Sequence, residues 1–526
     1  MRIGSRTVHA GAVATTVLAV LGAASALQAQ QPAAPAPGAP AVAAASGSAP
    51  AFEAKTPPPA QAEQKFVAEL QPRAGALRAD DVARKAEMTS PEVLSKVRAV
   101  EAAAAKVDQA AINFAPRLQL QARYVRLSPI TYASFGNIVG SQGAGPIMSQ
   151  CGATVGLPDG TCVATNAAAV PFSFPTPPVN MYSMQGTLGV PISDYVFRIS
   201  QNYAAASRSH SAAQLQEKAS RVKVARDARV AYYNWVRARG GLIVSEQGLA
   251  TAQAHLKDVG VAVQVGSASK ADFMRVESQV AQTELLVERT RNLVGLVQEQ
   301  LRVMMHDPAG STYDLGEDVW TPVANIGPTN IDQLQAEALE KRLEIRALDD
   351  TVYSLRETKK VLKAGYLPRI DAFANLYHQN PNTRIFPQKD EWRTTWDLGV
   401  QLSWTINDSF TSDSQVKELE AKTAELEAQK NMLRDGVRLE VMQASNAMRE
   451  AMVALDTTAR QLAAAEESYR VRRELFRAGR ATSVELTDAE TDLMRSRLEA
   501  LNARVDARIA RTNLEHALGR DVPAAK

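Results

Sequence analysis

The chain repeats itself, and this internal duplication constrains its fold more than any other feature. The segment QVGSASKADFMRVESQVAQTELLVE matches the later segment RAGRATSVELTDAETDLMRSRLEAL. Gly266 and Gly479 mark the same place in the two copies and lie 213 residues apart. The match holds at this spacing, without a gap, from Val224 to Leu301. A constant spacing over so many helical turns indicates two copies of one structural unit.

Earlier segments repeat as well. APRLQLQARY resembles LPRIDAFANL, and LGVPISD resembles LGVQLSWTIND. Pro116 and Pro368 lie 252 residues apart, whereas Leu188 and Leu398 lie 210 apart, so we expect the first copy to carry 42 extra residues between these segments. Each copy is predicted to run helix, strand, loop, strand, very long helix, tight turn and long helix. The first very long helix is predicted from about Tyr195 to about Val263, where there is no Pro and few helix breakers apart from the Gly240–Gly241 pair, and the second from about Gln415 to Phe476.

Four segments of about ten residues alternate between apolar and polar side chains, as strands do when one face is buried. The last is the clearest, with Trp396, Leu398, Val400, Leu402, Trp404 and Ile406 at every second position. This pattern is typical of a transmembrane barrel, but a soluble four-stranded sheet packed on helices would show it too. Because about eight strands are needed to close a barrel, a barrel would require a dimer with eight strands or a trimer with twelve.

The N-terminus predicts export. Arg2 and Arg6 precede an apolar run, and small residues near Ala26 and Ala29 offer a cleavage site, so residues 1–29 are predicted to be a signal peptide. Residues 30–75 are a linker rich in Pro and Ala. No later stretch is apolar enough for a membrane-spanning helix, so entry into a membrane would have to use strands.

The rest of the chain divides around the duplication. The first repeat, 76–306, contains two strands, a long loop and a helical hairpin. An inter-repeat connection, 307–332, leads to the second repeat, 333–521, and a tail, 522–526.

The repeated turn has a local explanation. Each turn combines a glycine that can end a helix, a hydroxyl that can cap the next helix and an acid three residues later. These residues are Gly266, Ser269 and Asp272 in the first copy, and Gly479, Thr482 and Glu485 in the second. Asp488 is not explained by capping, since it lies one helical turn beyond Glu485 on the same face.

The ordered, duplicated set of motifs resembles the TolC-like outer-membrane efflux protein family. The resemblance rests on the two turns, the Pro-Arg strand starts, the Leu-Gly-Val strands and the final LEHALGRD, and it covers Arg78 to Arg520. It implies a mainly α-helical chain with transmembrane β-strands, three copies of which form a twelve-stranded barrel in outer-membrane lipid above an α-helical periplasmic tunnel. It also implies a passive exit duct of a tripartite efflux or type I secretion system, docked through the hairpin tips to a periplasmic adaptor and an inner-membrane transporter.

The resemblance further implies a role for the acids of the second turn. In this family they line the closed periplasmic aperture, and Glu485 and Asp488 occupy the matching positions. Rings of three such carboxylates would attract cations. Some members have a locking basic residue where this chain has Ala481, so those locking contacts are not carried over.

Two other classes of function remain as alternatives. A periplasmic coiled-coil adaptor or spacer that never enters the membrane would normally have one helical hairpin, and this chain has two. A soluble periplasmic enzyme has no catalytic motif to support it. The formal net charge of +3 and the lack of a basic tract do not suggest a nucleic-acid partner.

Cys151 and Cys162 are the only cysteines, and both lie in the long first-copy loop. In an exported protein such a pair is expected to form a disulfide. The sequence VMMHD, which ends at Asp307, offers soft and borderline metal ligands, but it occupies the position of the helix-ending HALGR in the second copy. We therefore predict no metal site and no cofactor.

Overall fold

The computed structural model describes Arg73 and residues 75–129, 178–323 and 330–521, together with the backbone of four short strands between 137 and 171. The predicted signal peptide, nearly all of the predicted linker and the predicted tail lie outside the described residues. The chain divides into two compact units, Met1–Pro59 and Ala60–Lys526, and all described residues belong to the second.

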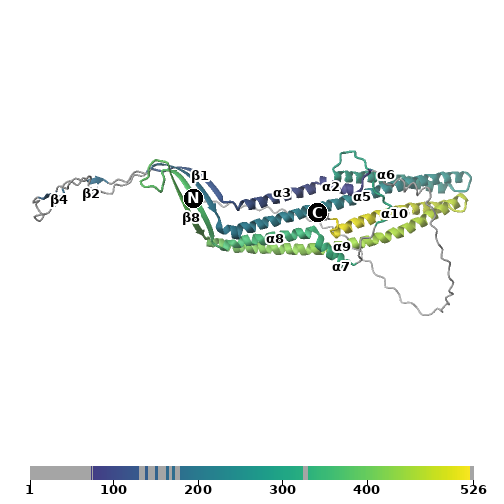
Figure 1. Ribbon diagram of the computed structural model, residues 1–526. Coiled ribbons are helices and arrows are strands. Elements are labelled where there is room, and N and C mark those ends of the chain that lie inside the picture. The colour runs from purple at the N-terminus through teal and green to yellow at the C-terminus, as the bar shows by residue number, and fades with distance from the viewer. Residues whose placement is uncertain are drawn as a thin grey trace, which may run out of the picture. The chain divides into compact units, whose positions relative to one another are not determined.

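Both repeats have the predicted order of elements (Figure 1). In the first repeat the elements are α2 (Ala79–Thr89), α3 (Pro91–Ile112), β1 (Arg117–Arg126), β6 (Asn180–Val190), α4 (Ile192–Asp194), η1 (Tyr195–Ile199), α5 (Ser200–Gln264) and α6 (Lys270–Met305). In the second they are α7 (Ile331–Lys341), α8 (Leu343–Lys363), η2 (Ala364–Tyr366), β7 (Arg369–Asn380), β8 (Arg393–Ser403), α9 (Ile406–Arg477) and α10 (Ser483–Ala517).

The four predicted strands form one antiparallel sheet in the order β1-β6-β7-β8. Each repeat contributes one hairpin, and β6 and β7 join the two hairpins. The sequence did not indicate the short strands of the first-copy loop, where β2 (Asn137–Val139) pairs with β5 (Ala169–Pro171) and β3 (Ser149–Cys151) pairs with β4 (Cys162–Ala164).

The register of the sheet corrects one part of the repeat alignment. Leu188 pairs with Leu118 in the first hairpin, and the equivalent position in the second is Leu402, which pairs with Ile370. The similar Leu-Gly-Val triplet at Leu398 is therefore displaced by four residues. The displacement is even, so it keeps every side chain on the same face of the sheet, which is why alternation alone did not expose it.

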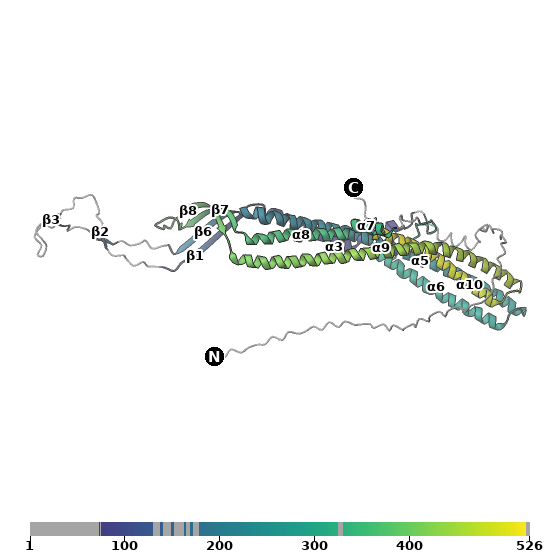
Figure 2. The same ribbon diagram turned by 90° about the horizontal axis from the view of Figure 1, so that it is seen from below.

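The helices lie alongside one another away from the sheet, with α5 against α3 and α8, and α8 against α9 (Figures 1 and 2). With 65 and 72 residues, α5 and α9 are too long for an ordinary core and are supported by lateral packing. α9 begins at Ile406, whereas the sequence predicts the start of this helix near Gln415. Among the described residues, no helix has both the length and the hydropathy needed to cross a membrane.

α5 is continuous through Gly240, as the predicted length of this helix requires. A Cβ atom at this position would lie 2.5 Å from Cδ2 of Leu501 on α10. The glycine is needed for close packing between the repeats, and the surrounding contacts hold the helix continuous.

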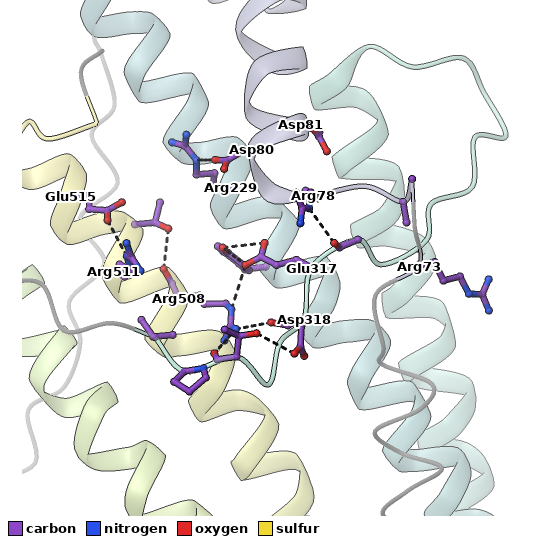
Figure 3. A pocket seen from close by; sticks show the side chains of 18 residues that line it. Arg73, Arg78, Asp80, Asp81, Arg229, Glu317, Asp318, Arg508, Arg511 and Glu515 are labelled. Carbon is purple, nitrogen blue, oxygen red and sulfur yellow. Dashed lines mark hydrogen bonds and ion pairs between the residues drawn. The ribbon is translucent and has the colours of Figure 1, made fainter. Parts of the chain in front are cut away.

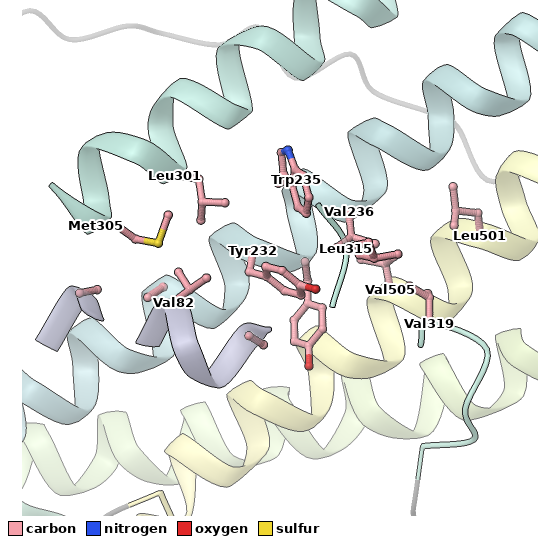
Figure 4. Close-up of a cluster of buried hydrophobic side chains, with 14 of the residues drawn as sticks. Val82, Tyr232, Trp235, Val236, Leu301, Met305, Leu315, Val319, Leu501 and Val505 are labelled. Carbon is pink, nitrogen blue, oxygen red and sulfur yellow. The ribbon is translucent and has the colours of Figure 1, made fainter. Parts of the chain in front are cut away.

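Two apolar clusters fill the helical part. In the first, Tyr232 and Trp235 of α5 pack with Leu301 and Met305 of α6 and Val505 of α10 (Figure 4). The second cluster joins α7, α8, α9 and α10. α10 contributes to both clusters, so it binds the two repeats into one unit.

Candidate functional site

The tips of the two helical hairpins carry most of the residues that the sequence singled out. Gly266 ends the turn after α5 with φ 79°, and Gly479 ends the turn after α9 with φ 69°. An added Cβ would meet no atom within 4 Å at either glycine. The requirement for glycine is therefore conformational and not one of space.

Both predicted capping boxes are confirmed. The Ser269 hydroxyl accepts from the Asp272 amide at 3.1 Å, and the Asp272 carboxylate accepts from the Ser269 amide at 3.1 Å. The Thr482 hydroxyl accepts from the Glu485 amide at 3.3 Å, and the Glu485 carboxylate accepts from the Thr482 amide at 3.0 Å. The hydrogen bond from the Ser269 hydroxyl lowers the pKa of Asp272. Each hairpin thus starts its returning helix with satisfied amides.

The two acids of the second tip differ in their surroundings. Glu485 and Asp488 are both exposed, but the Glu485 carboxylate is engaged by the start of its own helix. No hydrogen bond or ion pair joins Asp488 to another residue of the described part of the chain. Glu485 is therefore a capping acid, whereas the carboxylate of Asp488 faces solvent.

A buried histidine connects the two hairpins near their tips. His255 of α5 is 3% exposed, and its Nδ1 lies 3.1 Å from Oε2 of Glu490 on α10. Its Nε2 lies 3.4 Å from the hydroxyl of Ser483, and the ring packs edge-on against Phe476 of α9. An Nδ1–H donating to Glu490 and an Nε2 accepting from Ser483 satisfy all three groups.

This contact was not predicted from the sequence. Its only local signal is that His255 interrupts a helical stripe of buried apolar residues between Ala252 and Val259. Close by, Arg477 Nη2 lies 3.5 Å from Asp258 Oδ2, a second link between the hairpins. Both of its side chains are largely exposed, so this ion pair contributes little to stability.

A second polar region lies where α2, α5 and α10 meet the inter-repeat connection (Figure 3). It surrounds a hollow of about 910 Å³. Arg508 donates to the carbonyls of Asp318 at 2.8 Å and Thr321 at 2.9 Å, and its Nε lies 3.5 Å from Glu317. The Tyr233 hydroxyl donates to Glu317 at 3.1 Å, and burial raises the pKa of Tyr233. These contacts hold the inter-repeat connection against α5 of the first repeat and α10 of the second.

The VMMHD segment ends a helix, as its counterpart in the second copy predicted. Met305 is fully buried and is the last residue of α6, and His306 follows with φ 54°. Across the part of the chain that the structure describes, no group of three or more His, Cys, Asp or Glu could hold a metal ion.

The backbone brings the two cysteines opposite each other. Cys151 of β3 and Cys162 of β4 are register partners in an antiparallel ladder. Directly opposed residues in such a ladder have Cα atoms about 4.5–5.5 Å apart, which is within the span of a disulfide.

Comparisons with known proteins agree with this geometry. Residues 334–520 match the family model described as outer membrane efflux protein. No curated protein matches the chain. Among solved structures, the outer-membrane channel OprN is 15% identical with a TM-score of 0.65, covering 88% of this chain and 97% of its own. The outer membrane protein VceC of Vibrio cholerae is 14% identical with a TM-score of 0.65, covering 84% of this chain and 96% of its own. The CmeC outer membrane channel of Campylobacter jejuni is 13% identical with a TM-score of 0.64, covering 85% and 87%.

Proposed function

We propose that this chain is a member of the outer membrane efflux protein family, whose model matches residues 334–520, and that three copies of it assemble into the passive exit duct of a tripartite efflux or type I secretion system. It is an outer-membrane transport protein and not an enzyme. Energy for transport would come from an inner-membrane transporter, reached through a periplasmic adaptor.

The observation that carries the proposal is the exposed apolar face of the sheet. Leu120, Trp396, Leu398, Val400 and Leu402 are each at least 67% exposed, although all are large and apolar. Exposed apolar patches of this kind mark an interaction with a membrane or a partner. The opposite face carries Gln, Thr, Asn and charged side chains, as the lumen of a barrel requires.

The edges of the sheet support assembly from several chains. β1 and β8 each have one neighbour in the sheet of a single chain, so each leaves a row of backbone donors and acceptors unpaired. Pairing β8 of one copy with β1 of the next would satisfy both edges, and three copies would close twelve strands.

The hairpin tips are proposed to dock the adaptor. Gly266, Ser269 and Asp272 shape the first tip, and Gly479, Thr482 and Glu485 shape the second. Capping holds these exposed turns in one conformation, so a partner would meet preorganised surfaces. In the same assembly Glu485 and Asp488 would ring the periplasmic aperture.

We also propose a disulfide between Cys151 and Cys162 in the loop outside the cell, supported by their opposed backbone positions. An alkylating reagent should label neither thiol in the denatured protein until a reductant is added. Labelling without reductant would contradict the disulfide.

The assembly is tested by the native mass of protein extracted in detergent from washed outer membranes. We expect the mass of three chains. A protein recovered only from the soluble periplasmic fraction would end the duct proposal and favour a coiled-coil spacer.

A matched pair of variants tests which face of the sheet meets lipid. Val400→Arg places a charge on the apolar face, where arginine near the middle of the membrane costs about 2–4 kcal/mol per chain. Gln401→Arg places the same charge on the polar face of the same strand. We expect Val400→Arg to abolish the trimer and Gln401→Arg to preserve it. Equal loss of trimer in both variants would contradict the orientation.

A further inference from the structure

The sheet carries an excess of positive charge. Its four strands and the loop between β7 and β8 contain seven Arg or Lys residues and four Asp or Glu residues. Three of the basic residues lie on β1, which has no acidic residue: Arg117, Arg123 and Arg126. The excess is therefore concentrated on one strand.

Two of these arginines lie on the polar face. In the register of the sheet, Arg117 of β1 lies opposite Gly189 of β6, and Gly189 lies opposite Phe373 of β7. Arg123 lies opposite Ser183. Side chains alternate along a strand, so Arg117 and Arg123 share a face with Gln119 and Gln121. Arg126 stands an odd number of residues from both and lies on the opposite, apolar face.

The remaining basic groups of the polar face are neutralised by neighbouring carboxylates. The pairs are Arg369 with Asp371 at 2.9 Å, Arg384 with Asp397 at 2.7 Å and Arg393 with Glu391 at 2.8 Å. In contrast, no hydrogen bond or ion pair joins the side chain of Arg117 or Arg123 to another residue within the described ranges.

The long first-copy loop cannot supply the missing negative charge. Residues 130–177 contain one charged residue, Asp159, against two uncompensated arginines in each chain. Lys389 and Asp390, the other charged residues of the β7–β8 loop, offset each other. Even with Asp159 counted, the charges of the polar face sum to a net positive value.

Arg117 also borders a hollow on this face, with a volume of about 710 Å³. Phe373 and Tyr377 contribute aromatic rings to it, although both stand at polar positions of the strand pattern. Phe373 covers Gly399, where an added Cβ would lie 2.8 Å from Cζ of the ring. The ion pairs Arg369–Asp371 and Arg384–Asp397 also line the hollow, so its described lining keeps one net positive charge, that of Arg117. A net positive charge beside aromatic surface suits an aromatic anion.

We propose that Arg117 and Arg123 make the strand-built part of the duct selective for anions, and that the hollow beside Arg117 and Phe373 transiently binds aromatic carboxylates. The inference rests on the proposed function, because only in the closed barrel does this face line a duct. Three copies would place on the wall six arginines that have no ion pair among the described residues, and confinement and low-dielectric surroundings would strengthen their attraction for anions.

The strand-built part of the duct and the hairpin tips would then act in series, with opposite preferences for the charge of the ion. The acids of the tips favour cations, and the arginines of the strands favour anions. The overall selectivity reflects both, so the test must change one section and leave the other intact.

The test measures the reversal potential of purified trimers in planar lipid bilayers across a tenfold KCl gradient. We expect Arg117→Gln with Arg123→Gln to shift the potential toward cations, with a several-fold rise in the ratio of K⁺ to Cl⁻ permeability. Arg126→Gln removes the same charge from the other face of the same strand and should leave the potential as in the native protein. Sodium benzoate should reduce the native current and reduce it less in Arg117→Gln.

Each outcome decides the inference. An unchanged potential in the double variant, or an equal shift in Arg126→Gln, would overturn anion selection while leaving the trimeric duct in place. Equal block of native protein and Arg117→Gln by benzoate would overturn the binding site. A protein that forms no trimer and no conductance would overturn both the inference and the proposed function.

Discussion

His255 Nδ1 lies 3.1 Å from Oε2 of Glu490, and this contact joins the first helical hairpin to the second in the interior near their tips. The His255 side chain is 1% exposed and that of Glu490 is 11% exposed. A hydrogen bond to a charged group in such a place is worth more than one at the surface, because removing either partner leaves the other desolvated.

The first prediction concerns this contact. His255→Ala should leave the Glu490 carboxylate buried without its donor, at a cost of about 1–3 kcal/mol. Amides at the start of α10 should then exchange hydrogen faster, since the two hairpins are held less tightly. His210→Ala changes a partly exposed histidine of the same helix and should not alter exchange at α10. Equal exchange in native protein and His255→Ala would show that the contact does not hold the tips together.

The second prediction separates the two acids of the second tip. Asp488→Asn should weaken cation selectivity and the block by multivalent cations, because it removes a solvent-facing charge without touching the cap. Thr482→Ala should cost about 1 kcal/mol of helix stability through loss of the cap, with little effect on selectivity. The checks are reversal potential in a salt gradient and thermal unfolding. If Asp488→Asn left the reversal potential unchanged, the aperture assignment would be wrong.

The third prediction compares two helical glycines. Gly240→Ala should destabilise the fold by about 1 kcal/mol or more, because the added methyl group overlaps Leu501 in a packed interface. Gly436→Ala on α9 meets no atom within 4 Å and should stabilise the helix by about 0.5–1 kcal/mol. Thermal unfolding should give opposite signs for the two variants. The same sign in both would contradict the packing account of Gly240.

The fourth prediction is a pH dependence. Hydrogen bonds from Arg520 at 2.8 and 2.9 Å are the main cause that lowers the pKa of Glu337 to about 2. A carboxyl with a lowered folded-state pKa stabilises the fold above its unfolded pKa near 4.5, and this stabilisation is lost as the pH falls toward 2.

Glu337→Gln should therefore lower stability at pH 7 by about 1–2 kcal/mol, after allowance for solvent screening. The difference from the native protein should shrink as the pH falls from 5 toward 2. Glu340→Gln changes an exposed acid of the same helix and serves as the control. A difference that stays constant over this range would rule out the Glu337–Arg520 pair as its source.

Much of the site follows from the sequence because its interactions are local. The glycine, the hydroxyl and the acid of each turn lie within six residues of one another, and helix capping depends on such short spacings. The capping boxes and the positive φ of Gly266 and Gly479 could therefore be predicted. Asp488 could be singled out by the same reasoning, since capping left it unexplained.

The sequence by itself determined the duplicated order of elements, the faces of the four strands and the capped turns, because each depends on periodicity or on neighbours along the chain. Only the tertiary structure decided that Leu501 packs against Gly240 and that His255 contacts Glu490. It also decided that Leu188 and Leu402 occupy equivalent positions in the two hairpins. These relationships join residues far apart in the chain, and helical or strand period does not specify which side chains meet across a packed interface. The net charge of the polar face follows from sequence and tertiary structure together. The sequence contains the arginines, and the structure shows which of them are paired with carboxylates.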